Sequence, residues 1–151
     1  EMGTQQILMI VLSVIIVGIA VGVGITMFQN QAKTSNRQAL LGDLRNFSSN
    51  AIAFYKIPSS MGGGGNGTPG FLGNSGNGSE LKMYLGFDAD DNTFSNENGT
   101  YTLGALTATQ VKITGVGKEV GQDGSTPVKA DVTVMANLTS GAVKDSISTT
   151  N

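Results

Sequence analysis

The stretch near residue 90 is the most acidic local cluster in this sequence, and its side chains could bind a metal ion. Its carboxylate and amide groups lie at Asp88, Asp90, Asp91 and Asn92. Ca²⁺ takes six to eight oxygen ligands, and alternating Asp and Asn side chains on a loop supply such oxygens. The spacing does not complete an EF-hand, because Gly99 stands at the twelfth position, where a Glu is required. The stretch therefore predicts either a Ca²⁺ site or a solvated acidic turn.

Two residue types that often carry catalysis and metal binding are missing. The chain has no His and no Cys, so it lacks the commonest general base, a thiolate nucleophile and zinc–sulfur ligands. Nine Lys and Arg against eleven Asp and Glu give a net charge of −2, which suits nucleic-acid binding poorly. We therefore expect neither an enzyme nor a nucleic-acid binder, and no cofactor other than the candidate Ca²⁺.

Asn side chains offer a second kind of chemistry. Asn-x-Ser/Thr sequons, which accept N-linked glycans in a suitable compartment, occur at Asn46, Asn66, Asn77, Asn98 and Asn137. A chain this rich in Asn, Gly, Ser and Thr also contains such triplets by chance. The sequons therefore predict surface glycosylation, and unmodified polar loops are the alternative.

The element that precedes these groups is a long apolar segment. Residues 2–32 carry no charge, and the run from Ile7 to Phe28 would form a helix about 33 Å long, enough to cross a bilayer core. A helix that is apolar all round must be buried in lipid or among copies of itself. The run exceeds the h-region of a secretory signal and no basic n-region precedes it, so we expect the helix to be retained.

The helical pattern continues beyond the apolar run with a different character. Apolar residues recur at spacings of four, three, four and three, which marks one face of an amphipathic helix: Leu40, Leu44, Phe47, Ala51 and Phe54. Pro58 is the first proline, so the sequence predicts one helix from about residue 3 to 55, roughly 80 Å long. Its apolar stripe needs a packing partner.

The rest of the chain predicts a glycine-rich segment followed by strands. Residues 59–79 form either a flexible linker or an ordered surface loop, and Phe71 and Leu72 favour the loop. Alternation and turn residues then predict short antiparallel strands at 101–106, 110–116, 128–138 and 142–148.

These elements define the expected fold. It is α+β, with the long helix packed on a small antiparallel sheet of three or four strands. We expect an N-terminal helix over 1–56, with 1–30 as membrane or filament core and 31–56 as the amphipathic half. A glycine-rich surface loop over 57–80 and a β-rich globular head over 81–151 complete the chain.

This architecture resembles a type IV pilin, most closely over QILMIVLSVIIVGIAVGVG, Gln6 to Gly24. The resemblance implies a subunit that sits in the cytoplasmic membrane until a prepilin peptidase removes a short basic leader. The pilus assembly machinery then builds a filament whose core is a bundle of these helices. It thus implies a structural protein of the cell surface that polymerises with itself and serves adhesion, motility or surface attachment.

The sequence departs from the bacterial pattern at its start. Mature bacterial pilins typically begin with Phe and carry Glu fifth, whereas this chain has Glu1 and Gln5, and the usual Cys pair is absent. A carboxylate at Glu1 would favour the positive end of the helix dipole. A minor pilin, a type II secretion pseudopilin and a monomeric single-span membrane protein with a small binding domain therefore remain alternatives.

Two sets of residues on the apolar helix carry the polymerisation hypothesis. We predict helix–helix contacts through Glu1, Ile7, Ile10, Val14, Val17, Val21, Ile25 and Phe28. Gly18 and Gly22 let helices approach closely, and each glycine lowers helix propensity by about 1 kcal/mol. Part of this helix is commonly unwound in pilin filaments, so we predict local melting near Gly18, Gly22 and Gly24 in the assembled state.

Overall fold

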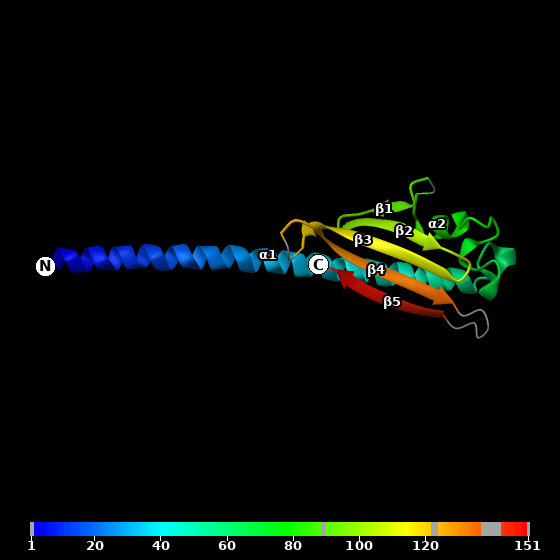
Figure 1. Cartoon of the computed structure of the whole chain (residues 1–151), viewed down its shortest axis with the longest axis horizontal. Coiled ribbons are helices and arrows are strands. Elements are labelled where there is room, and N and C mark those ends of the chain that lie inside the picture. Colours follow the sequence, from blue (N-terminus) through cyan, green and yellow to red (C-terminus); the bar gives the residue numbers. More distant parts are fainter. Residues whose placement is uncertain (1, 89, 122–123, 137–142, 151) are drawn as a thin grey trace.

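A single long helix and a small sheet make up most of the molecule. The computed structural model of the chain describes residues 2–88, 90–121, 124–136 and 143–150. Helix α1 (Met2–Lys56) packs its C-terminal half against a five-stranded antiparallel sheet, while its N-terminal half projects from this head (Figure 1). The expected α+β fold class is therefore confirmed, and α1 extends one residue beyond each end of the predicted helix.

The C-terminal half of α1 supplies one side of the hydrophobic core. The predicted apolar stripe is buried in full, together with Ser48 and Tyr55: Leu40, Leu44, Phe47, Ala51 and Phe54. These residues recur every three or four positions, so they lie on one side of the helix and face the sheet together. Burial of this stripe fixes the head on α1.

The sheet contains five strands in sequence order, each antiparallel to the next. They are β1 (Thr93–Ser95), β2 (Gly99–Leu106), β3 (Gln110–Val120), β4 (Pro127–Ala136) and β5 (Val143–Thr150). On the central strands, inward apolar residues alternate with more exposed ones, as a sheet with one covered face requires. The expectation of three or four strands was one too few, because β1 is too short to show alternation.

Glycines on β3 allow α1 to lie close to the sheet. A Cβ on Gly117 would stand 2.0 Å from Asn36 Oδ1 of α1, and a Cβ on Gly115 would stand 3.5 Å from Leu40 Cδ2. A side chain at Gly117 would therefore displace Asn36 of α1, whereas one at Gly115 would first meet the Tyr101 ring, which lies 3.0 Å away. Gly117 therefore leaves room for Asn36 between the two layers of the head.

The glycine-rich segment is folded against the end of α1. It forms three short 3₁₀ turns, η1 (Ser59–Met61), η2 (Gly65–Gly67) and η3 (Gly70–Leu72). The Gly64 amide donates to the Phe54 carbonyl at 2.9 Å, which satisfies an acceptor at the helix end. Phe71 is fully buried. In this structure the segment is therefore folded against α1, as the ordered-loop hypothesis expects.

A short helix follows this segment and was not expected from the sequence. Helix α2 (Ser79–Leu85) has seven residues and lies between Gly78 and Gly86, both with positive φ. Its buried residues Leu81 and Leu85 stand four positions apart and join the core. The helix therefore closes the core near the C-terminal end of α1.

Candidate functional site

The N-terminal half of α1 is the surface that most needs a partner. Every large apolar side chain between Met2 and Phe28 is more than half exposed, from 51% at Val11 to 83% at Met2. Soluble monomers rarely expose contiguous apolar patches beyond a few hundred Å². The helix is also long and apolar enough to cross a membrane. This surface therefore requires lipid or protein around it.

The predicted polymerisation residues share one side of this surface. They recur at spacings of three and four and all are exposed: Ile7, Ile10, Val14, Val17, Val21, Ile25 and Phe28. From Phe28, four-residue steps lead through Ala32 and Asn36 to Leu40, which the sheet covers completely. The head thus covers one end of this row and leaves the other open. Glu1 lies outside the described residues, and the role of all these side chains in polymerisation stays a prediction.

Hydroxyl groups within the apolar half already have partners on the same helix. Ser13 Oγ donates to the Met9 carbonyl at 2.8 Å, and Thr26 Oγ1 donates to the Gly22 carbonyl at 3.1 Å. Such bonds satisfy the hydroxyls without water, which an apolar environment requires. These two polar residues are therefore compatible with burial in lipid or in a helix bundle.

The three glycines of the apolar half are helical in the single chain. α1 is continuous through Gly18, Gly22 and Gly24, and a Cβ at any of them would meet nothing within 4 Å. These positions therefore leave room for a close neighbour. The expected melting refers to the assembled state, so it stays a prediction.

A polar anchor that the sequence did not reveal joins α1 to the β1–β2 turn. Asp43 Oδ2 accepts hydrogen bonds from Asn96 Nδ2 and Asn98 Nδ2, each at 2.8 Å, and from the Tyr101 hydroxyl. Asn36 Nδ2 donates to the Asn98 carbonyl at 2.8 Å. In the local sequence, this anchor is marked by nothing more than Asp43 beside the apolar stripe, because the partners of Asp43 lie more than fifty positions away.

The electrostatics of this anchor follow from its hydrogen bonds. Burial alone would raise the pKa of Asp43, but the bonds from Asn98, Tyr101 and Asn96 outweigh burial and hold that pKa below its usual value. Burial, reinforced by the bond to Asp43 and by its charge, raises the pKa of the Tyr101 hydroxyl. Asp43 is therefore an ionised structural anchor that accepts hydrogen bonds from Asn96, Asn98 and Tyr101.

The acidic stretch forms a tight turn that leads into β1. Asp88 Oδ1 accepts from the Asp90 amide at 2.9 Å, and the Asn92 amide donates to the Asp88 carbonyl at 3.0 Å. Among the described residues, no three His, Cys, Asp or Glu side chains are grouped so that they could hold a metal. The described part of the turn, which includes Asp91, therefore gives the Ca²⁺ hypothesis no support.

The sequons differ in how far their side chains are available. Asn46, Asn66 and Asn77 are exposed, while Asn137 lies outside the described residues. Asn98 Nδ2, the atom that would carry an N-linked glycan, is occupied by its bond to Asp43. Glycosylation stays a prediction, and Asn98 is the described sequon least suited to it.

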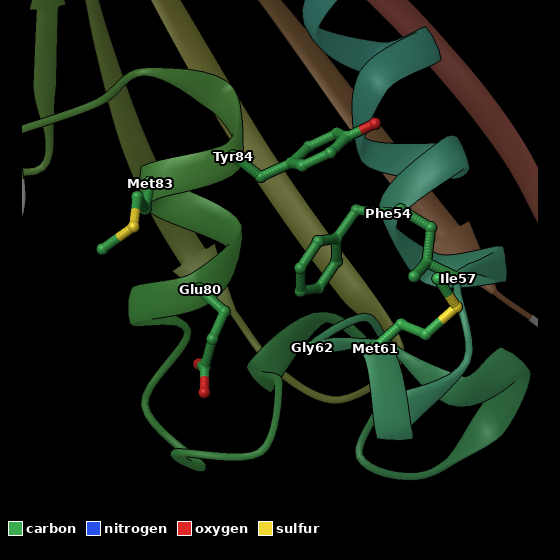
Figure 2. Close-up of a pocket in the computed structure, with 7 residues that line it drawn as sticks. All are labelled: Phe54, Ile57, Met61, Gly62, Glu80, Met83 and Tyr84. Carbon is green, nitrogen blue, oxygen red and sulfur yellow. The ribbon is translucent and has the colours of Figure 1, made fainter.

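A shallow cavity of about 340 Å³ lies between the end of α1, η1 and α2 (Figure 2). Figure 2 shows Phe54 and Tyr84 pointing toward each other, while Met83 points away. The ring centroids of Phe54 and Tyr84 are 5.6 Å apart. Among the described residues that line it, Glu80 alone is charged, and its Oε1 accepts from the Ser75 amide at 2.8 Å. Hydrogen bonds, chiefly from Ser75, lower the pKa of Glu80, so this carboxylate orders the preceding loop.

Comparison with known proteins identified no relative of this chain. No protein-family model matches the chain, and no significant similarity to a curated protein or a solved structure was found. The functional argument therefore depends on the residues and the geometry described above.

Proposed function

We propose that this chain is a structural subunit that polymerises through the N-terminal half of α1 into an extracellular, type IV pilus-like filament. One observation carries the proposal. The N-terminal half of α1 extends beyond the folded head, and its large apolar side chains are all exposed. A bundle of such helices, with the heads outside, would cover these side chains by repeating a single contact pattern.

The magnitude of the burial favours a stable assembly. Sixteen large apolar side chains lie exposed between Ile7 and Phe28. At roughly 1.5–3 kcal/mol for each fully buried side chain, their removal from water is worth tens of kcal/mol before ordering is subtracted. A subunit that leaves the membrane therefore needs other copies around this helix.

In this proposal the subunit occupies two environments in succession. Before assembly the apolar half of α1 would sit in the cytoplasmic membrane, and afterwards it would lie in the filament core on the cell surface. A prepilin peptidase and the pilus assembly machinery are the proposed partners for this transfer. Adhesion, motility or surface attachment is the proposed role of the filament.

A monomeric, single-span membrane protein is the competing proposal, because α1 is long and apolar enough to cross a bilayer. Shearing intact cells separates the two hypotheses. We expect the sheared supernatant to contain filaments in which mass spectrometry identifies this chain. Recovery of the chain in the membrane fraction alone would favour the single-span protein.

A further inference from the structure

An open groove lies where α1 leaves the head. It has a volume of about 480 Å³ and runs between the helix and the end of the β3–β4 hairpin. Phe28, Ala32 and Lys33 line it on the helix, and Glu119 and Val120 line it on the hairpin. In Figure 1 this hairpin lies beside α1 at the point where the helix emerges from the head.

The walls of the groove are held in place by contacts one helical turn further on. The Glu119 amide approaches Asn36 Oδ1 at 3.5 Å, and Gly117 leaves the room that the Asn36 side chain needs. Asn36 also donates to the Asn98 carbonyl at 2.8 Å. The hairpin is thus fixed on α1 just beyond the groove, so the groove is part of the folded head.

Apolar side chains are exposed on both walls. Phe28 is 73% exposed and Val120 is 40% exposed. The volume is about three times that of an apolar cavity of roughly 150 Å³ that binds benzene, so several aliphatic side chains would fit. The groove is also continuous with the exposed surface of α1, since Ile25 lies one turn before Phe28.

We propose that this groove receives the apolar helix of a second copy of the chain, through side chains between residues 7 and 28. This inference rests on the proposed filament. A helix that covers Ile25 and Phe28 must reach the groove, because the groove begins at Phe28. The segment from 7 to 28 has no charge, so it leaves Lys33 and Glu119 at the groove edge in water.

The arrangement has a consequence for assembly. Beyond the groove, the row from Asn36 to Leu40 is already occupied by β3 of the same chain. A neighbouring helix can therefore follow α1 only as far as the hairpin. The hairpin end limits the axial position of that neighbour and helps to set the spacing between subunits.

Engineered cysteines test this contact without background, because the chain contains none. A chain with Val120→Cys is produced together with chains that carry one cysteine at successive positions from 7 to 17. Within one chain these positions lie about 15 Å or more along the helix from Phe28, too far for a disulfide to Val120. Met135→Cys, at the opposite end of the hairpin strands and 51% exposed, is the matched control.

After mild oxidation of sheared filaments, we expect disulfide-linked dimers with Val120→Cys at helix positions that recur every three or four residues. The yield should exceed that of Met135→Cys at least tenfold. Filaments that show no such excess would overturn the inference and leave the proposed function standing, with lipid or solvent in the groove.

If no filament forms, the same oxidation is carried out on isolated membranes, and disulfide-linked dimers are detected by non-reducing gel electrophoresis. Dimers at Val120→Cys in the membranes of cells that form no filaments would support the groove contact, while the missing filaments would refute the proposed function. Absence of both filaments and dimers would refute both proposals.

Discussion

Removal of the Asp43 carboxylate should loosen the head from α1. In Asp43→Ala, the two amide groups and the Tyr101 hydroxyl that converge on Oδ2 lose their acceptor. A hydrogen bond to a charged group contributes about 1.5–3 kcal/mol, but three donors share one oxygen here and the site is partly open to water. We therefore expect the free energy of unfolding to fall by about 2–3 kcal/mol in total.

Thermal unfolding followed by circular dichroism measures this change on residues 30–151. The expected loss corresponds to a melting temperature lower by roughly 5–10 °C. Asp131→Ala is the matched control, since it removes the ion pair with Lys112 at 3.2 Å, which is worth at most about 1 kcal/mol because both side chains are partly exposed. Equal melting temperatures for the two variants would refute the anchor.

The pH dependence gives an independent check of the same carboxylate. The pKa of Asp43 in the folded head lies below its ordinary value of 3.8. The ionised group therefore stabilises the fold above that value, and its contribution is lost as the pH falls through the folded pKa. The difference in the free energy of unfolding between wild type and Asp43→Ala should stay constant down to about pH 5 and should decrease below about pH 4. A difference that persists undiminished at still lower pH would contradict this assignment.

Further predictions concern packing and metal binding. Gly117→Ala should destabilise the head by about 1–3 kcal/mol, because its Cβ would clash with α1, whereas Gly104→Ala, which meets only a contact at 3.6 Å, should melt near wild type. Phe71→Ala should cost about 3–5 kcal/mol by urea unfolding, while Phe28→Ala should leave head stability unchanged; similar losses would contradict the burial difference. Titration calorimetry with millimolar Ca²⁺ should give no binding heat at the acidic turn of 88–92, and a saturable signal would revive the metal hypothesis.

Periodic burial made the largest elements predictable from the sequence. The stripe from Leu40 to Phe54 repeats every three or four residues because one side of α1 faces the sheet. The alternation in β3 and β4 arises in the same way from one covered face. Long elements contain enough repeats for such a pattern to be recognised.

Elements without repeats, and contacts between distant residues, were missed. The strand Thr93–Ser95 has only three residues, and helix Ser79–Leu85 is hidden in a glycine-rich context that favours a loop. The anchor joins Asp43 to residues more than fifty positions away, so no local spacing marks it. The groove at Phe28 likewise arises only when the hairpin is placed beside the helix.

Electron microscopy of the sheared fraction, with and without residues 7–28, tests self-assembly through α1 most directly. The full chain should yield thin filaments, and the deleted chain should yield a monomeric head, because the deletion removes the apolar surface that copies share. A chain that still forms filaments without this segment would contradict the central claim.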